Sequence, residues 1–263
     1  MRPLAVSPRK KVVAIIQARV GSTRLPSKIL EKIEGKPMLW HVIERTKRAR
    51  FVDEVVVATT DREEDSAVEE IAKVCGVGCF RGSEEDVLDR YYRAAEKFGA
   101  DIVVRITADC PMMDPEVIDK AVRMFLDGDF DYVSNTMPPT FPDGLDVEVF
   151  SFEALRKAWA EARMASEREH VTPYIRNHPE IFRLGNLRSD VDLSYMRWTV
   201  DRIEDLMFVR EVYKELYVEG EVFHMEDVLR LLERRPELME INRHIERDEG
   251  YKKSLREDRV VRP

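Results

Sequence analysis

The chain contains little cysteine and no long apolar run. Only three of its 263 residues are cysteine, at positions 75, 79 and 110, and none of them has CxxC spacing. An odd number of such cysteines does not predict a disulfide framework, so we expect reduced thiols in a core. No stretch reaches the roughly 20 apolar residues of a transmembrane helix, and the apolar stretch after the basic segment 1–11 is too short for a secretory signal. We therefore expect a cytoplasmic protein that does not enter a membrane.

A positive net charge is also missing. The 43 Lys and Arg residues are outnumbered by 51 Asp and Glu residues, which gives a formal net charge of -8. Proteins that bind nucleic acid usually carry a basic surface, so nucleic acid is not an expected partner. Glutamine occurs only at Gln17, whereas 36% of the residues are charged, a balance that points toward a thermophilic source.

The stretch from Val12 to Leu30, VVAIIQARVGSTRLPSKIL, changes character abruptly. Its first five residues are short, apolar and rich in Val and Ile, which predicts a strand buried on both faces. The following loop combines a permissive glycine, hydroxyl groups and three cations within ten residues, a composition suited to holding a polyphosphate. No second glycine precedes Lys28 in GxxxxGK spacing, so the loop is not a Walker A motif. We expect another kind of triphosphate-binding loop; the alternative is a solvated turn with scattered basic residues. The candidates are Arg19, Gly21, Ser22, Thr23, Arg24 and Lys28.

Alternating strand and helix patterns in the first half predict an α/β fold. Strand-like runs cover 12–16, 54–60, 77–80, 101–107 and 131–135, with helical patterns at 37–48, 63–74, 84–98 and 114–126 between them. This alternation predicts a mainly parallel sheet in a three-layer arrangement. Ligands of such sheets bind beyond the carboxyl ends of the strands, which would bring residues 19–28, 59–61, 107–109 and Asn135 together.

The second half is less regular. Residues 145–150 alternate with a period of two, and further strands are expected at 182–187 and 197–200. Helices are expected at 152–163, 168–177, 203–217, 225–234 and 238–244. The last stretch, 247–263, is mostly charged, which predicts a surface extension or a disordered tail. We expect a main domain over residues 1–220, followed by a helical extension and charged tail over residues 221–263.

Two aspartates follow predicted strands and are candidate magnesium ligands. Asp109 comes after the strand that ends at Thr107, and Asp201 comes after the apolar Val200. Magnesium is commonly held by one or two carboxylates together with substrate phosphates, so two aspartates at neighbouring strand ends suit it. The alternative for Asp201 is an N-cap on the helix that follows.

Four further residues have less decisive patterns. His170 lies beside Glu167, Arg168 and Glu169, where it could bind a carboxylate or act as a base; the alternative is an ordinary surface histidine. Asp86 and Arg90 are spaced one helical turn apart, which also suits a surface ion pair. Glu148 alternates with two valines, so its side chain is expected to point away from theirs.

Several motifs resemble one known family, the CMP-sugar synthetases that act on 3-deoxy-manno-octulosonate and acylneuraminates. The opening IIQARVGSTRLPSK is similar to the signature of these cytidylyltransferases, and the branch of spore-coat polysaccharide biosynthesis protein F is closer still. The similarity extends through RGSEEDVLDRYYRAA, RITADCPMMDPEVID, DGLDVEVFS, EREHVTPYI and RWTVDRIEDL, over residues 12–217. TADCP replaces the QGDEP of the octulosonate enzymes, and VDRIEDL replaces VDTPEDL, so the sugar stays open.

The resemblance implies a fold, a reaction and a set of site residues. The fold would be the Rossmann-like nucleotide-diphospho-sugar transferase fold with a helical C-terminal segment. The reaction would transfer CMP from CTP to an acidic sugar with release of pyrophosphate, in cell-surface polysaccharide biosynthesis. Arg24, Lys28 and Asp109 would be catalytic, and Mg²⁺ would be held by Asp109 and Asp201. Substrate-binding residues would be Ala18, Arg19, Gly21, Ser22, Asp86, Arg90, Arg105, Asn135, Glu148 and His170.

Three questions stay open at the level of sequence. CTP is not distinguished from other nucleoside triphosphates, since base selection often rests on backbone contacts, and a homodimer is neither required nor excluded. The reaction has two alternatives. The chain could be a glycosyltransferase of the same fold that consumes a nucleotide sugar, or a non-catalytic subunit that binds one. Retention of both aspartates and of the whole loop argues against the non-catalytic subunit.

Overall fold

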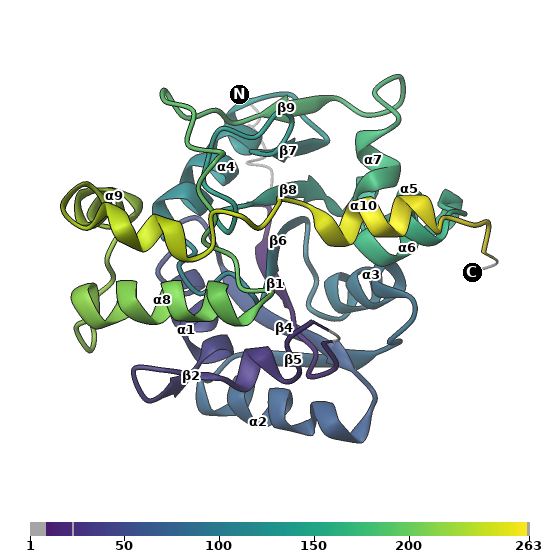
Figure 1. Cartoon of the computed structure of the whole chain (residues 1–263). Helices are drawn as coiled ribbons and strands as arrows, with labels where there is room; N and C mark the ends of the chain where they lie inside the picture. Colours follow the sequence, from purple (N-terminus) through teal and green to yellow (C-terminus); the bar gives the residue numbers. More distant parts are fainter. Residues whose placement is uncertain (1–8, 23, 262–263) are drawn as a thin grey trace, which may run out of the picture.

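A seven-stranded sheet forms the centre of the molecule in the computed structural model (Figure 1). The structure describes residues 9–22 and 24–261, so Thr23 of the predicted phosphate loop and most of the basic segment 1–11 lie outside the described residues. The strand order is β5-β4-β1-β6-β8-β7-β9. The predicted α/β class and mainly parallel sheet are confirmed. None of the helices described is long and apolar enough to cross a membrane.

The parallel half of the sheet consists of four strands whose carboxyl ends share one edge. They are β5 (Gly78–Gly82), β4 (Glu54–Thr60), β1 (Val12–Gln17) and β6 (Ile102–Thr107). Gln17, the last residue of β1, lies opposite Ala58 on one side and Thr107 on the other. Strand β1 is therefore central, which explains why its apolar run is buried on both faces. The loop after Gln17 emerges in the middle of the edge where ligands bind.

The other half of the sheet contains an antiparallel insertion. Strand β8 (Glu148–Ser151) runs antiparallel to both β6 and β7 (Tyr132–Ser134), and β9 (Leu184–Asn186) pairs parallel with β7. Because β8 runs against β6, it begins where β6 ends, and Glu148 lies opposite Arg105 in register. Glu148 is thereby placed at the same edge as the loop after β1.

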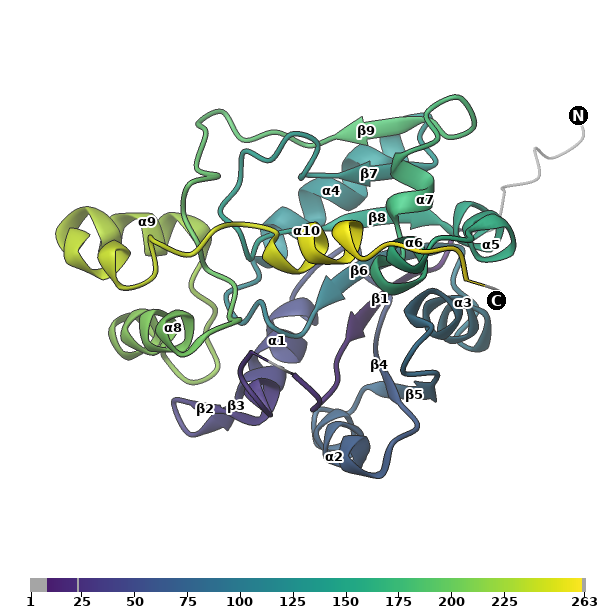
Figure 2. The same ribbon diagram turned by 45° about the vertical axis from the view of Figure 1, so that its right-hand side comes forward.

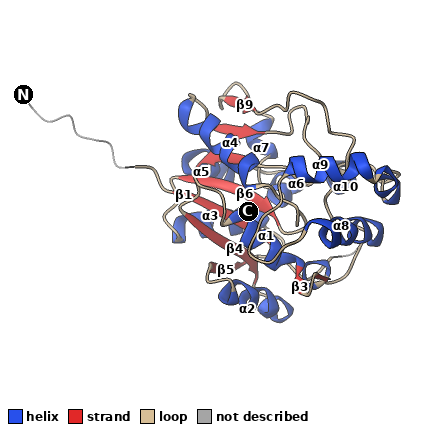
Figure 3. Ribbon diagram, turned by 90° about the vertical axis from the view of Figure 1, so that its left-hand side faces the viewer, coloured by secondary structure: helices blue, strands red, loops and turns tan. Residues whose placement is uncertain are grey.

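Helices cover both faces of the sheet, which makes three layers (Figure 3). Two separate apolar clusters, one on each face, show which helices share a side. One cluster packs α1 (Met38–Thr46), α2 (Ser66–Val74), α4 (Pro115–Asp127), α8 (Ile203–Leu216) and α9 (Met225–Arg234) against the sheet. The other packs α3 (Val87–Lys97), α5 (Phe152–Glu161) and α7 (Pro173–Arg176). A small hairpin of β2 (Lys32–Ile33) and β3 (Lys36–Pro37) follows the phosphate loop.

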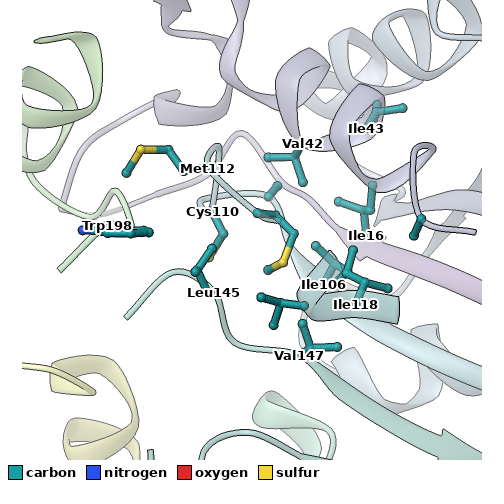
Figure 4. Packing of buried hydrophobic residues seen from close by; sticks show 14 of the residues in the cluster. Ile16, Val42, Ile43, Ile106, Cys110, Met112, Ile118, Leu145, Val147 and Trp198 are labelled. Atoms are coloured by element: carbon teal, nitrogen blue, oxygen red, sulfur yellow. The ribbon is translucent and has the colours of Figure 1, made fainter. Parts of the chain in front are cut away.

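The larger cluster continues underneath the ligand-binding edge. Figure 4 shows Cys110 and Leu145, which follow or precede strands, near Ile106 and Val147 of the sheet region, with Met112 farther out toward Trp198. Trp198 closes this cluster and is almost completely buried. Buried apolar side chains next to Asp109 and Asp201 in the sequence pack into this cluster, which limits how far the two segments can move apart.

The C-terminal part differs most from the sequence-based expectation. Residues 197–200 do not form a strand: they contribute an isolated bridge between Asp143 and Arg197 and a hydrogen bond from Val200 to the carbonyl of Asp109, 2.8 Å. The predicted helix at 168–177 is two short ones, α6 (Ala165–His170) and α7, and the last predicted helix is a 3-10 helix, Pro236–Ile241. Residues 223–238 join the main apolar cluster, so the extension shares the core of residues 1–220.

The charged tail is a surface extension, as expected, but it is ordered. Residues 249–256 form helix α10 (Glu249–Arg256), which has no buried residue, and the chain around it crosses the ligand-binding edge (Figure 2). Ion pairs hold it there: Arg247 contacts Asp146 at 2.5 Å, and Arg202 contacts Glu249 at 2.9 Å. The disordered alternative is wrong, because these pairs join the tail to residues distant in the sequence, which composition alone does not reveal.

Candidate active site

The beginning of the phosphate loop is anchored by two backbone hydrogen bonds. The backbone of Ala18 donates to the carbonyl of Ala58 at 3.1 Å, and the backbone of Val20 donates to the carboxylate of Asp65 at 2.6 Å. Asp65 is buried and also accepts from the hydroxyl of Thr60. The sequence analysis missed this residue, although an Asp that follows a buried strand within five residues is the same signal that identified Asp109. The loop is therefore positioned by β1 and by the turn after β4.

Lys28 lies at the centre of the site. Its Nζ donates to Asp109 Oδ2 at 2.9 Å, to Asp201 Oδ1 at 2.7 Å and to the carbonyl of Val200 at 2.8 Å, and the residue is only 8% exposed. Burial alone would lower the pKa of Lys28, but the two carboxylates outweigh it and raise that pKa above its ordinary value. Burial likewise opposes ionisation of Asp109, yet Lys28 lowers the pKa of that carboxyl to about 2. Lys28 and Asp109 are therefore both charged at neutral pH.

Asp201 is surrounded by cations. Besides Lys28, its Oδ1 accepts from Arg24 at 2.6 Å, and its Oδ2 accepts from Arg197 at 3.2 Å. The capping alternative for Asp201 is wrong, because Asp205 caps the helix instead. Asp205 Oδ2 accepts from the backbone of Asp201 and of Arg202 at 2.9 and 3.0 Å. The Asp201 carboxylate is consequently not used in capping and faces the phosphate loop.

Arg197 and Asp205 are site-supporting residues that the sequence analysis did not identify. The guanidinium of Arg197 pairs with Asp205 and Asp143 at 2.9 Å each, in addition to Asp201. Asp205 is fully buried and also accepts from the amide of Asn242 at 3.0 Å. A buried, fully paired network of this kind fixes the direction of each carboxylate. RWTVDRIEDL carries both residues, but only the long-range pairing reveals their role.

The donor set around Lys28 suits a magnesium ion. Asp109 and Asp201 approach the same ammonium from two different segments, so their carboxylates are close enough to serve one cation site. Lys28 uses only Oδ2 of Asp109; the other oxygen, Oδ1, lies 3.7 Å from the Cys110 thiol. No described group of three or more His, Cys, Asp or Glu side chains forms a metal site by itself. Two carboxylates completed by phosphate oxygens would be the usual arrangement for Mg²⁺.

A second group of residues lies farther along the same edge. The guanidinium of Arg105 pairs with Glu148 and donates to the side-chain carbonyl of Gln17 at 3.3 Å. Glu148 Oε1 also accepts from the hydroxyls of Tyr132 and Thr172, at 2.5 Å each. Burial would raise the pKa of Glu148, but Arg105 and its neighbours outweigh it and lower that pKa. Glu148 is thus a fully ionised, fully bonded carboxylate beside the end of β1.

His170 belongs to this second group and is not an ordinary surface histidine. Its Nε2 lies 2.9 Å from the hydroxyl of Ser254, which is in α10. Burial, assisted by Arg105 and Arg176 and opposed by Glu169, lowers the pKa of His170 to about 4. The imidazole is therefore neutral at physiological pH and available for hydrogen bonding rather than for charge pairing.

The remaining predicted residues occupy different positions. Arg19 is exposed and contacts Glu84 at 3.6 Å, while Gly21 and Ser22 lie in the loop, where the Ser22 hydroxyl accepts from the backbone of Leu25 at 3.4 Å. A Cβ on Gly21 would lie 3.3 Å from a carboxylate oxygen of Glu64, so the glycine lets these segments approach closely.

Asp86, Arg90 and Asn135 have structural partners. The surface ion pair considered for Asp86 and Arg90 is wrong: Asp86 caps α3 and pairs with Arg168 at 2.5 Å, while Arg90 is fully buried and donates to the carbonyl of Ser83 at 2.6 Å. The amide of Asn135 bonds the backbone of the segment leading to Glu148, donating at 2.7 Å and accepting at 2.9 Å. Contact of these three residues with substrate stays a prediction.

Comparison with known proteins identifies relatives over nearly the whole chain. Residues 13–237 match a family model described as cytidylyltransferase. The spore coat polysaccharide biosynthesis protein SpsF of Bacillus subtilis is 33% identical over 235 residues, which cover 86% of this chain and 95% of that protein. An uncharacterised protein of Methanocaldococcus jannaschii is 39% identical over 246 residues, covering 92% and 98%. The solved structure of a cytidylyltransferase from Leptospira borgpetersenii is 36% identical, has a TM-score of 0.84, and covers 88% of this chain and 97% of its own.

Proposed function

The chain belongs to the cytidylyltransferase family, as its motifs predicted, and from this premise we propose that it transfers CMP from CTP to an acidic sugar with release of pyrophosphate. The observation that carries the proposal is the buried ammonium of Lys28, which joins the phosphate loop to two carboxylates from other segments. The name of the relative SpsF refers to polysaccharide biosynthesis, and we place the product of this enzyme in that process.

The residues around Lys28 account for the phosphate chemistry. A triphosphate bound along residues 18–28 would face Arg24 and Lys28, whose positive charges stabilise the pyrophosphate as it leaves. The sugar oxygen forms a bond to the α-phosphorus, its proton departs, and the bond from that phosphorus to the pyrophosphate oxygen breaks. Reactions of this type depend mainly on positioning and charge stabilisation. A magnesium ion held by Asp109, Asp201 and the phosphates would withdraw charge from the phosphoryl oxygens.

A bound triphosphate must draw Arg24 away from Asp201 before Asp201 can serve as a ligand of a metal ion. In the structure Asp201 accepts from Arg24, Lys28 and Arg197, so both of its oxygens are used. A bound triphosphate offers Arg24 a second anionic partner and would draw it away from Asp201. Arg24 would then serve as the element that responds to the nucleotide, whereas Lys28 and Arg197, both largely buried, stay in place.

The second group of residues would receive the sugar. Gln17 connects the two groups, because it ends β1 immediately before the phosphate loop and accepts from Arg105. An acceptor bound beside Glu148 and His170 would approach the α-phosphate along the same sheet edge. Neutral His170 can hydrogen-bond a sugar hydroxyl, and ionised Glu148 holds Arg105 beside it, without a change of protonation near neutral pH.

Pyrophosphate release separates this function from its alternatives. CTP, ATP, GTP and UTP are each incubated with magnesium, the protein, and either 3-deoxy-manno-octulosonate or an acylneuraminate; we expect pyrophosphate from CTP and only with a sugar present. Asp109→Asn serves as the inactive control. A glycosyltransferase would consume a nucleotide sugar without forming pyrophosphate. A non-catalytic subunit would bind the nucleotide sugar, detected as a thermal shift, with no turnover of any pair. Either result would refute the proposal.

A further inference from the structure

Arg176, the last residue of α7, has no counter-charge. Its guanidinium forms no hydrogen bond and no ion pair with the residues 9–22 and 24–261 that the structure describes, and its Nε is buried without a partner. The nearest group that contacts it is the ring of Tyr251, whose centroid lies 5.2 Å from the guanidinium carbon. A buried donor without an acceptor is unfavourable, and an anionic ligand at Arg176 would supply one.

The obvious internal partner is already taken. Glu148 is near enough to Arg176 to interact electrostatically, but its carboxylate is held by Arg105, Tyr132 and Thr172. The pair of Arg105 and Glu148 is neutral as a unit, and His170 beside it is uncharged. Arg176 is therefore a cation on the acceptor side of the site that no described carboxylate contacts, which leaves its guanidinium available to an anion.

Helix α10 supplies the aromatic contact to this charge. Tyr251 lies over Arg176, and its ring also meets that of His170 at a centroid distance of 5.0 Å. One residue earlier, Gly250 approaches the phosphate loop: a Cβ there would lie 3.7 Å from the guanidinium of Arg24. Figures 1 and 2 both show α10 lying across the sheet edge toward α6. The segment thus spans from the phosphate loop to the acceptor residues.

We propose that Arg176 binds the acidic group of the acceptor sugar and that Tyr251 of α10 closes over this contact. The inference rests on the proposed function and names the residues that would select its acceptor. A guanidinium can bind a carboxylate or a phosphate through two parallel hydrogen bonds, and exclusion of water by the tyrosine ring strengthens both. Arg176 is then a specificity residue, and the charged tail is part of the active site.

Four variants test this assignment in the full-length protein. Arg176→Gln removes the charge, Arg176→Lys keeps it without the two-pronged geometry, and Tyr251→Leu removes the aromatic cover. Arg123→Gln is the matched control, because Arg123 makes the same kind of contact with Phe51, at 5.0 Å, on helix α4 away from this edge. Thermal unfolding checks that all four fold, and nucleotide affinity checks that the phosphate side is intact.

The acceptors form a matched series. They are 3-deoxy-manno-octulosonate and an acylneuraminate, the C1 amide of whichever acid reacts, glucose 6-phosphate and glucose. We expect the wild type to use an acid and Arg176→Gln to raise its KM at least tenfold, with the amide changed less than twofold. Arg176→Lys should recover part of the loss, Tyr251→Leu should raise the KM several-fold, and Arg123→Gln should match the wild type. The KM for CTP should stay constant throughout.

Each other outcome has a definite meaning. Use of glucose 6-phosphate with the same dependence on Arg176 supports the role of Arg176 and identifies phosphate as the acidic group. Equal KM values for wild type and Arg176→Gln, or use of glucose alone, overturn the inference while the cytidylyltransferase reaction stands. If no sugar reacts, the proposed function fails first. In that case the thermal shift of the CTP-loaded protein is measured with the same sugars. If an acidic sugar stabilises the wild type but not Arg176→Gln, the inference is supported. If no acidic sugar stabilises the wild type, or if it stabilises both proteins equally, the inference is overturned.

Discussion

Replacement of Lys28 by methionine should expose the charge balance of the active site. Lys28→Met keeps most of the side-chain volume and removes the ammonium that Asp109, Asp201 and the Val200 carbonyl share. Removing one member of a buried ion pair typically costs about 3–5 kcal/mol, since the remaining charges stay buried. The side chain of Asp109 is 27% exposed and that of Asp201 is 15% exposed. Because water can relieve Asp109 in part, we expect a loss near the lower limit, about 3 kcal/mol of the free energy of unfolding.

Magnesium should restore part of this loss in the variant. Without the ammonium, the two carboxylates repel each other and form a better cation site than in the wild type. A ligand present at 100 times its dissociation constant adds about 2.7 kcal/mol to the free energy of unfolding. Urea unfolding is measured with and without an excess of magnesium, in the absence of nucleotide. We expect a clear gain in Lys28→Met and a much smaller one in the wild type.

Lys157→Met provides the control for loss of a lysine ion pair. Lys157 pairs with Glu161 at 2.9 Å, but both side chains are at least 40% exposed, and such pairs are worth at most about 1 kcal/mol. If Lys28→Met costs no more than Lys157→Met and does not respond to magnesium, the carboxylates of Asp109 and Asp201 do not share a buried cation. The reasoning about the site would then be refuted.

Three further predictions concern turnover, nucleotide binding and pH. Asp109→Asn and Asp201→Asn should each fold yet lower turnover by about 100-fold or more, measured as pyrophosphate release at saturating CTP and sugar; near-normal turnover of either variant would remove that residue from the metal site. Arg24→Ala should weaken CTP binding in calorimetry by more than the roughly fivefold that an exposed ion pair provides, and an unchanged affinity would contradict the phosphate-loop assignment. The lowered pKa of His170, about 4, favours the neutral imidazole in the folded state, so its contribution to stability should be complete above pH 6.5 and decline as the pH falls toward 4. His170→Gln should therefore lose less stability than the wild type across that interval in pH-dependent thermal unfolding.

The sheet and the position of the loop after β1 were predictable because their signals are local. Strand β1 is central, so its five leading residues are all apolar, and the loop after it must bring its functional groups close together in sequence. Asp109 was found for the same reason, as a carboxylate directly after a buried strand. Such features depend on a few adjacent residues, which the sequence displays without knowledge of the fold.

The support of the site was not predictable, because it depends on pairs far apart in the chain. Arg197 meets Asp143, 54 residues away, and Asn242 reaches Asp205 across 37 residues. The order of the tail was missed for the same physical reason: Arg247 and Glu249 look solvated in sequence, but each pairs with an opposite charge on another segment. A high content of charge therefore does not predict disorder where such partners exist.

The balance of charge around Lys28 bears on how a nucleotide enters. Ion pairs join three cations and four carboxylates into one cluster around Lys28. The cations are Arg24, Lys28 and Arg197, and the carboxylates are those of Asp109, Asp143, Asp201 and Asp205. With every group ionised the cluster is negative by one charge, so a bare triphosphate would meet like charge beyond its contact with Arg24. A triphosphate that carries a divalent cation removes this repulsion and supplies the ion that Asp109 is open to receive. If the site binds magnesium as proposed, the excess of carboxylates would favour joint entry of nucleotide and metal, and the buried Lys28 would keep the two aspartates together until they arrive.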